Sequence, residues 1–304
     1  MSTRNPVVSV IIPTYNRAED LKRAIDSVLK QTFQDFEILI IDNHSSDATD
    51  EMISHINNAT IFVHKINNRG IIAASRNLGI KAARGKYIAF LDSDDWWTVD
   101  KLNRSVEELD KGMDLVYHDL FLVKKLKEKK YFEKVGVRSL DKAVYDDLLR
   151  NGSAIPNSSV VVRTELLRKI NGLSEDIRLI AAEDYECWLR LSLITDKFLC
   201  INETLGFYWQ GLNNSSSAAR SFKHVKRLEE LYFEKYIKDQ EIDIPSWILY
   251  HKARAAYLLD EFSVALPALK ILSKKRLEFG IKLKVIYMLI STIRRSRMTK
   301  KLTK

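Results

Sequence analysis

The first hundred residues alternate between short apolar runs and segments in which apolar residues recur at helical spacing. Four runs rich in β-branched and aromatic residues end in Asn, Asp, Gly or Pro, as strands commonly do: VVSVIIPTYN, FEILIIDNHSSD, ATIFVHKINNRG and KYIAFLDSDD. Two apolar stripes lie between them, one of Leu21, Ala24, Ile25, Val28 and Leu29 and one of Ile71, Leu78 and Ala82. This alternation predicts βαβ units and an α/β fold in which helices flank a mostly parallel sheet.

The rest of the chain divides by composition. DLVYHDLFLV indicates a strand, NSSVVVRTELL indicates a strand that runs into a helix, and EDYECWLRLSLI indicates an amphipathic helix. After NNSSSAARS the sequence is rich in Lys, Leu and Glu and favours helices. We therefore expect an α/β domain at residues 1–212 and a helical, basic region at residues 213–304.

The overall composition indicates a folded, soluble protein, since 46% of the 304 residues are hydrophobic and 29% are charged. Apolar stretches such as VIYMLI are much shorter than the roughly 20 residues that a bilayer requires. The N-terminus lacks the pattern of a signal peptide, so we expect a cytoplasmic protein. The two cysteines, Cys187 and Cys200, have no CxxC spacing, which argues against a disulfide framework or a zinc site.

The formal net charge of +9 is concentrated at the C-terminal end, in STIRRSRMTKKLTK. A nucleic-acid-binding module would interleave basic and aromatic residues on a recognition surface, and this pattern is not found, so we expect no nucleic-acid partner. Two interpretations of the basic helices remain open. They lie on the anionic cytoplasmic face of the inner membrane as a peripheral contact, or they pack together with their Lys and Arg side chains in solvent.

Polar segments follow each of the four expected strands, and such strand ends meet at one edge of a parallel sheet, where ligands bind. Asp92 and Asp94 are two residues apart at the end of the fourth strand, so their carboxylates can face the same side. Oxygen ligands of this kind suit Mn²⁺ or Mg²⁺ and leave positions open for substrate phosphates. The alternative is that these aspartates are turn and helix-cap residues, and Asp95 fits the cap of a helix near residues 99–110 better than a metal site.

Four segments occur in a fixed order along the chain: VSVIIPTYNR, IIDNHSSD, NRGIIAASRNLGIKAARGKYIAFLDSDD and AAEDYECWLRLS. As an ordered set they closely resemble the family 2 glycosyltransferases of GT-A fold, over roughly Val7 to Tyr208. The resemblance implies a Rossmann-like GT-A domain, which the helical C-terminal region extends. It also implies a metal-dependent enzyme that uses a UDP-sugar.

The resemblance assigns roles to individual residues. The segment Pro13, Thr14, Tyr15, Asn16 and Arg17 would line the nucleotide pocket, Asp42 would hydrogen-bond the uracil edge, and Arg76 would lie near the base and diphosphate. The segment Asp92, Ser93 and Asp94 would hold the metal and the sugar nucleotide, with Asp94 and Asp92 as the metal ligands. Asp184 would be the catalytic base, with Glu183 beside it. Each residue also has a structural alternative as a strand end, a turn, a surface charge or a first-turn acid of a helix.

The sequence departs from the family pattern after the second strand. The family commonly has Asp-Asp-Gly-Ser there, whereas this chain has Asp42, Asn43, His44 and Ser45. The turn therefore lacks its usual glycine. Farther along, Pro156, Asn157 and Ser158 match a family region between the donor and acceptor sites, although a loop before a strand explains them equally well.

These features together predict an inverting glycosyltransferase. It would move a hexose or N-acetylhexosamine from a UDP-sugar to a hydroxyl of a glycan acceptor on a lipid diphosphate carrier, in the synthesis of a surface polysaccharide of O-antigen type. A UDP-α-sugar would give a β-linked product. A glycoside hydrolase with Asp94 and Asp184 as paired carboxylates is a rival function, but it leaves the nucleotide-pocket segments unexplained. The other rival is a non-catalytic basic module that binds a membrane or nucleic acid.

Overall fold

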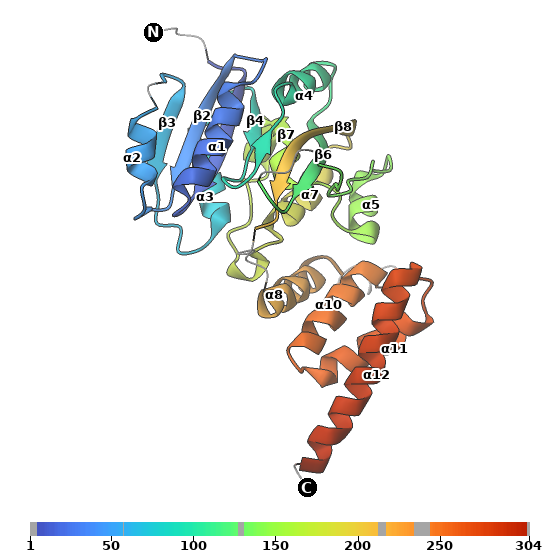
Figure 1. Cartoon of the computed structure of the whole chain (residues 1–304). Coiled ribbons are helices and arrows are strands. Elements are labelled where there is room, and N and C mark those ends of the chain that lie inside the picture. The colour runs from blue at the N-terminus through green and yellow to red at the C-terminus, as the bar shows by residue number, and fades with distance from the viewer. Residues whose placement is uncertain (1–4, 57, 127–130, 212–216, 234–243, 303–304) are drawn as a thin grey trace. The chain divides into compact units, whose positions relative to one another are not determined.

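The computed structural model describes residues 5–56, 58–126, 131–211, 217–233 and 244–302 (Figure 1). The chain forms two compact units. The first unit comprises Met1–Leu148, Ser153–Glu175 and Glu183–Asn214, and the second comprises Leu149–Gly152, Asp176–Ala182 and Ser215–Lys304. The boundary that we expect at residues 212/213 stays a prediction, because it falls outside the described residues.

The first unit is built on one sheet with the strand order β3-β2-β1-β4-β7-β6-β8-β5. Its strands are β1 (Val8–Thr14), β2 (Phe36–Asp42), β3 (Ile61–Lys65), β4 (Tyr87–Phe90), β5 (Trp96–Trp97), β6 (Leu115–Val123), β7 (Val161–Arg163) and β8 (Phe198–Trp209). The pairs β1·β2, β1·β4, β2·β3 and β6·β8 are parallel, whereas β4·β7, β6·β7 and β5·β8 are antiparallel. The mostly parallel sheet expected from the sequence is confirmed.

Helices cover this sheet (Figure 1). They are α1 (Ala18–Leu29), α2 (Thr49–Ser54), α3 (Ile72–Ala82), α4 (Lys101–Asp110), α6 (Thr164–Lys169) and α7 (Glu183–Ser192), with the 3-10 turn η1 (Asn157–Ser159). Helix α5 (Val144–Asn151) has residues in both units, and the 3-10 turn η2 (Ile177–Leu179) belongs to the second. Strands β1, β2 and β4 are buried along their whole length, as expected of parallel strands with both faces covered.

The buried face of α1 contains the predicted residues Leu21, Ala24, Ile25 and Val28. The apolar stripe predicted for residues 71–82 is wrong, because this segment forms α3, whose buried face consists of Ala73, Ser75, Arg76, Gly79 and Ile80. A Cβ on Gly79 would come 2.6 Å from Cγ2 of Ile11, so a glycine is needed for α3 to lie this close to β1. Arg76 lies on this same buried face of α3.

The carboxyl ends of the central strands meet at one edge of the sheet. Thr14 at the end of β1 is in register with Asp42 at the end of β2, and Ile11 is in register with Phe90 at the end of β4. The strand order reverses direction between β1 and β4. A ligand site is expected at such a reversal, and the predicted polar segments lie there.

The second unit contains α8 (Ala218–Leu228), the π-helical turn η3 (Glu229–Phe233), α10 (Ser246–Leu258), α11 (Phe262–Lys274) and α12 (Phe279–Leu302). Its core lies among α10, α11 and α12, and it includes Leu249, Ala253, Ala256, Ala265, Leu269, Leu272 and Val285. No helix within the described ranges combines the length and the apolar character needed to cross a membrane.

Candidate active site

The side chain of Arg76 joins three elements at the carboxyl edge of the sheet. It is 3% exposed, its Nη1 donates to Oε1 of Glu183 at 2.7 Å, and its Nη2 donates to Oδ1 of Asp92 at 2.7 Å. Burial alone would lower the pKa of Arg76, but the two carboxylates raise it above its usual value, so the guanidinium is charged. Helix α3, the end of β4 and the start of α7 are thereby held together.

The carboxylates of Asp92 and Asp94 lie at the end of β4, and each is paired with an arginine. Asp94 forms an ion pair with Nη1 of Arg17, and Asp92 also accepts a hydrogen bond from Nδ2 of Asn157 at 3.3 Å. Ser93 is buried between them. Burial and the nearby charge of Asp92 raise the pKa of Asp94, whereas the Arg17 cation opposes this rise.

Asp95 is not the helix cap that the sequence predicts. Helix α4 begins only at Lys101, with Asp100 at its N-cap, and the Asp95 carboxyl is buried instead. It accepts hydrogen bonds from Oγ of Ser158 at 2.5 Å and from the backbone N–H of Trp209 at 2.9 Å. Burial, followed by the charges of Asp94 and Asp92, raises its pKa well above the usual value.

Glu183 and Asp184 are the first two residues of α7. Burial, and then the negative charge of Glu183, raises the pKa of Asp184 to about 6, although the Arg76 cation opposes the shift. Oδ1 of Asp184 accepts a hydrogen bond from the backbone N–H of Tyr185 at 2.7 Å. A carboxylate with a pKa close to neutral is well suited to general-base catalysis.

Buried polar atoms without a hydrogen-bond partner occur on several of these residues. Within the described residues they include Oγ1 of Thr14, Nε of Arg76, Oδ1 of Asn157 and Oε2 of Glu183. Buried polar atoms in folded proteins are nearly always hydrogen-bonded, to protein or to water. Several unsatisfied atoms on neighbouring site residues therefore indicate a region that a polar ligand or water molecules would fill.

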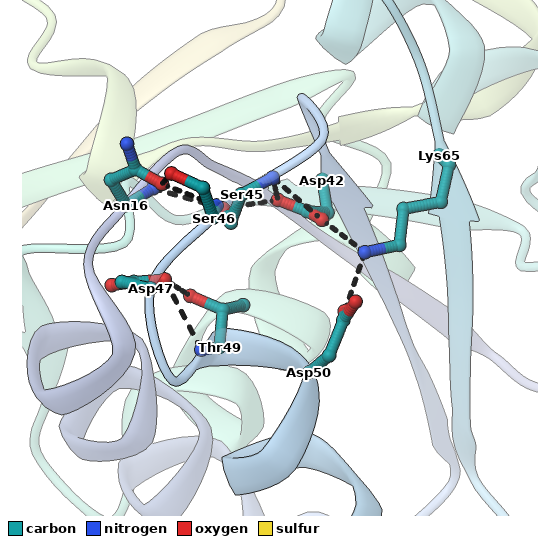
Figure 2. A network of polar contacts seen from close by, with 8 residues as sticks. All are labelled: Asn16, Asp42, Ser45, Ser46, Asp47, Thr49, Asp50 and Lys65. Atoms are coloured by element: carbon teal, nitrogen blue, oxygen red, sulfur yellow. Dashed lines mark hydrogen bonds and ion pairs between the residues drawn. The ribbon is translucent and has the colours of Figure 1, made fainter.

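A second polar network links the ends of β1 and β2 (Figure 2). The Asp42 carboxylate is fully buried and accepts hydrogen bonds from the backbone N–H of Ser45 at 3.1 Å and from Nζ of Lys65 at 2.6 Å. Lys65 also pairs with Asp50 at 2.5 Å, and Oγ of Ser45 accepts a hydrogen bond from the backbone N–H of Asn16 at 2.9 Å. The segments after β1 and β2 are thus tied together.

The turn after β2 has a left-handed backbone conformation, which glycine usually adopts, at a residue that is not glycine. His44, at the position where the family commonly has glycine, has φ = 53° and is in the left-handed region. This conformation costs a non-glycine residue about 1–2 kcal/mol. The hydrogen bonds from the Ser45 N–H to Asp42 close the turn and offset part of that cost.

The remaining predicted residues of the nucleotide segment lie at the end of β1. Pro13 and Thr14 are buried as the last two residues of the strand, Tyr15 is 56% exposed, and Asn16 has φ = 50°. The structure therefore brings together Arg17, Arg76, Asp92, Asp94, Glu183 and Asp184 in one charged cluster, and it links Asn16 to Asp42 in the other.

Other residues of the charged cluster have no signal in the sequence. Burial, and then the negative charges of Asp95, Asp92 and Asp94, raises the pKa of Tyr208 to about 12. Arg23 donates to the backbone oxygen of Asp94 at 2.9 Å, and its guanidinium lies 4.6 Å from the ring centroid of Trp96. The sequence shows that Arg23 follows the nucleotide segment, but nothing in it connects this arginine with Trp96.

Comparison with known proteins identifies relatives of the first unit. Residues 9–168 match the model of the family described as "Glycosyl transferase family 2". The chain is 39% identical over 189 residues to an uncharacterized glycosyltransferase of Rickettsia felis, a match that covers 61% of this chain but only 30% of that relative's length. It is 27% identical to the Escherichia coli protein WfaP, named a UDP-Glc:alpha-D-GlcNAc-diphosphoundecaprenol beta-1,3-glucosyltransferase, over 73% of this chain and 83% of WfaP.

Two solved structures share the fold. The Staphylococcus aureus protein TarS 1–349 in complex with UDP has a TM-score of 0.57 at 17% identity, covering 98% of this chain and 92% of TarS 1–349. The mannosyltransferase PcManGT of Pyrobaculum calidifontis, in complex with GDP-Man and Mn²⁺, has a TM-score of 0.56 at 18% identity, covering 96% and 87% of the two chains. The expected GT-A fold is confirmed, and because the family model matches more than half of its residues, this chain belongs to glycosyl transferase family 2.

Proposed function

We propose that this family 2 enzyme transfers a hexose or N-acetylhexosamine from a UDP-sugar to a hydroxyl of a glycan acceptor on a lipid diphosphate carrier, with inversion at the anomeric carbon. The observation that carries the proposal is the position of Arg76, which bridges Asp92 in the D-x-D segment and Glu183 next to the expected base. The names of WfaP and WfgD, both acting on a diphosphoundecaprenol-linked sugar, support this acceptor class. The name of TuaG, a putative teichuronic acid biosynthesis glycosyltransferase, supports a role in polysaccharide synthesis.

The residues at the end of β4 fit a divalent cation. Asp92 and Asp94 supply only oxygen ligands, their side chains are 28% and 24% exposed, and the pKa of Asp94 is raised partly by its negative neighbour. The described residues contain no cluster of three or more metal-ligating side chains, so other ligands would come from water and the donor diphosphate. Mn²⁺ or Mg²⁺ held by Asp94 and Asp92 would stabilise the charge that develops on the departing diphosphate.

The proposed reaction needs a base opposite the leaving group. The Asp184 carboxylate would accept the proton of the acceptor hydroxyl while that oxygen attacks the anomeric carbon and the bond to the UDP oxygen breaks. Arg76, buried and fixed by two carboxylates, would add positive charge near the diphosphate, while Glu183 holds the arginine in place. A single displacement of this kind turns a UDP-α-sugar into a β-linked product.

The network in Figure 2 would form the nucleotide end of the site. We propose that Asp42 accepts a hydrogen bond from the uracil edge, and that the exposed ring of Tyr15 lies against the base. Pro13, Thr14 and Asn16 would shape the pocket around the nucleotide. Asp42 is already paired with Lys65, so the lysine would lower the free energy of the buried carboxylate before the donor binds.

The proposed acceptor would bring the enzyme to the cytoplasmic face of the inner membrane as a peripheral protein. Basic helices of the second unit would make this contact, because Lys and Arg side chains are attracted to the anionic lipids that surround a lipid-linked acceptor. Membership of the glycosyltransferase family argues against the hydrolase and the non-catalytic module as functions.

A panel of UDP-sugars with Mn²⁺ and a lipid-diphosphate-linked sugar, read by product mass, tests the proposed reaction. We expect one donor to give a product one sugar heavier, and Asp184→Asn to abolish transfer while UDP binding measured by calorimetry persists. Release of free sugar without any need for a nucleotide donor would instead identify a hydrolase. Failure to bind UDP with or without Mn²⁺ would overturn the proposal.

A further inference from the structure

Helix α12 of the second unit, labelled in Figure 1, has apolar residues both in the core and at the surface. Val285 and Met288 are buried in the core with α10 and α11. On its other side the helix exposes an apolar stripe at helical spacing, which consists of Phe279, Leu283, Ile286, Tyr287 and Ile290. Phe279 is 78% exposed and Tyr287 is 68% exposed. A contiguous apolar surface of this kind marks an interaction site.

The stripe borders a groove between α10 and α12. The groove has a volume of about 410 Å³, and its lining includes Tyr250, Arg254, Tyr257, Leu283, Lys284 and Tyr287. The lining is mostly apolar and aromatic, and the two cations supply its formal charge. The side chains of Arg254 and Lys284 are exposed, and within the described residues neither has an acidic partner.

The surface combines an apolar centre with two cations that no carboxylate neutralises within the part of the chain that the structure describes. An amphiphile with apolar chains and a negatively charged head matches both features, and phenol rings favour the boundary between acyl chains and water. The stripe from residue 279 to residue 290 extends for roughly 16 Å along the helix. A stripe that continues past the groove suits a membrane surface better than one enclosed lipid molecule.

We propose that this face of α10 and α12, rather than the basic C-terminal end, docks the protein on a membrane that carries anionic phospholipid. Leu283, Ile286 and Tyr287 insert among the acyl chains, and Arg254 and Lys284 pair with lipid phosphates. The inference deepens the membrane contact of the proposed function and depends on it for its biological role. Membrane docking itself can be measured without donor or acceptor.

The test is co-sedimentation of the full chain with vesicles of phosphatidylcholine, with and without phosphatidylglycerol. We expect binding only to the anionic vesicles, and binding that weakens as salt is added. The double variant Leu283→Ser/Tyr287→Ser and the single variant Lys284→Glu should each weaken binding by roughly tenfold or more. Lys270→Glu on α11 is the matched control, since Lys270 is exposed and does not line the groove.

Three results would overturn the inference. They are absence of wild-type binding to anionic vesicles, equal binding by the double variant, and conversion of a wild-type dimer to a monomer by the double variant in light scattering. The last result would show that a second copy of the chain covers this face. Thermal unfolding of each variant verifies that it is folded, and UDP binding measured in parallel separates failure of docking from failure of the proposed function.

Discussion

The guanidinium of Arg17, at the start of α1, forms an ion pair with the carboxylate of Asp94 at the end of β4. The Arg17 side chain is 36% exposed, so it can leave Asp94 without any change in the core. Arg76 differs, because it is buried and bound to two carboxylates. One arginine of the site is thus free to exchange partners, whereas the other is fixed.

We expect Arg17→Met to strengthen Mn²⁺ binding in the absence of nucleotide, by up to about fivefold. The reason is that the cation no longer competes for Asp94, and a partly exposed ion pair contributes up to about 1 kcal/mol. The same variant should bind UDP more weakly. Electron paramagnetic resonance of free Mn²⁺ and calorimetry with UDP measure the two effects. Arg104→Met removes an exposed arginine elsewhere and should change neither affinity; unchanged Mn²⁺ affinity in Arg17→Met would contradict the expectation.

Arg76→Met should destabilise the protein by about 3–5 kcal/mol, because it leaves the buried Glu183 and its neighbour Asp92 without a counter-charge. Arg76→Lys should restore only part of this loss, since a lysine cannot make both contacts in the same geometry. Urea unfolding measures the free energy of unfolding. For Arg104→Met the expected loss is below about 1 kcal/mol, because its ion pairs are exposed. An equally small loss for Arg76→Met would rule out a buried charge cluster.

The rate of transfer should fall as the pH decreases through about 6, because protonated Asp184 cannot accept a proton and its pKa is about 6. This pKa is raised from 3.8, so the native state binds more protons than the unfolded state between the two values. The stability that Asp184 contributes is therefore present below pH 3.8 and is lost as pH rises through 6.

It follows that Asp184→Asn should be more stable than the wild type at neutral pH, by about 1–3 kcal/mol, while transfer is lost. The pH profile of kcat/KM and urea unfolding at several pH values provide the measurements. A flat pH profile between pH values of about 5 and 8 would assign the base to another residue.

Lys101→Met should raise the free energy of unfolding by about 1–2 kcal/mol near neutral pH. Nζ of Lys101 is buried 3.8 Å from the ring centroid of Trp97, and among the described residues it has no hydrogen-bond partner. Burial lowers the pKa of Lys101 well below 10.5, so the unfolded state binds more protons and wild-type stability rises with pH. The gain from Lys101→Met should therefore shrink toward pH 10.

Urea unfolding at about pH 7 and about pH 9 measures this trend. Lys111→Met, at an exposed position on the same part of the chain, should have little effect at either pH. A loss of stability in Lys101→Met would show that the contact with Trp97 outweighs the burial of the amine.

Much of the first unit could be predicted because β1, β2 and β4 are continuous apolar runs that end in polar residues. Strand β8 could not, since Asn202, Glu203 and Thr204 interrupt its apolar residues and its pairing with β6 is irregular at His118 and Asp119. The buried face of α3 was also missed. Its burial depends on close contact at Gly79 and on carboxylates far along the chain from Arg76, which an apolar pattern cannot reveal.

The sequence allowed the roles of only some acidic residues at the end of β4 to be predicted. The positions of Asp92 and Asp94 follow from the strand and its D-x-D sequence. The position of Asp95 depends on Ser158 and Trp209, whose contacts with it span 63 and 114 residues of sequence. Local propensity favours a cap at Asp95, and tertiary hydrogen bonds override that preference.

The contacts of Ser158 limit how this enzyme can be engineered. Its hydroxyl donates to Asp95 and accepts from the backbone N–H of Asp92, and its carbonyl accepts from the indole of Trp97 at 2.7 Å. The 3-10 turn η1, which carries Ser158, thus links the acidic residues at the end of β4 to Trp97. Randomising Ser158 to obtain new sugar preferences would therefore also remove the two hydrogen bonds that its hydroxyl makes with Asp92 and Asp95, so diversity is better introduced at neighbouring side chains without such contacts.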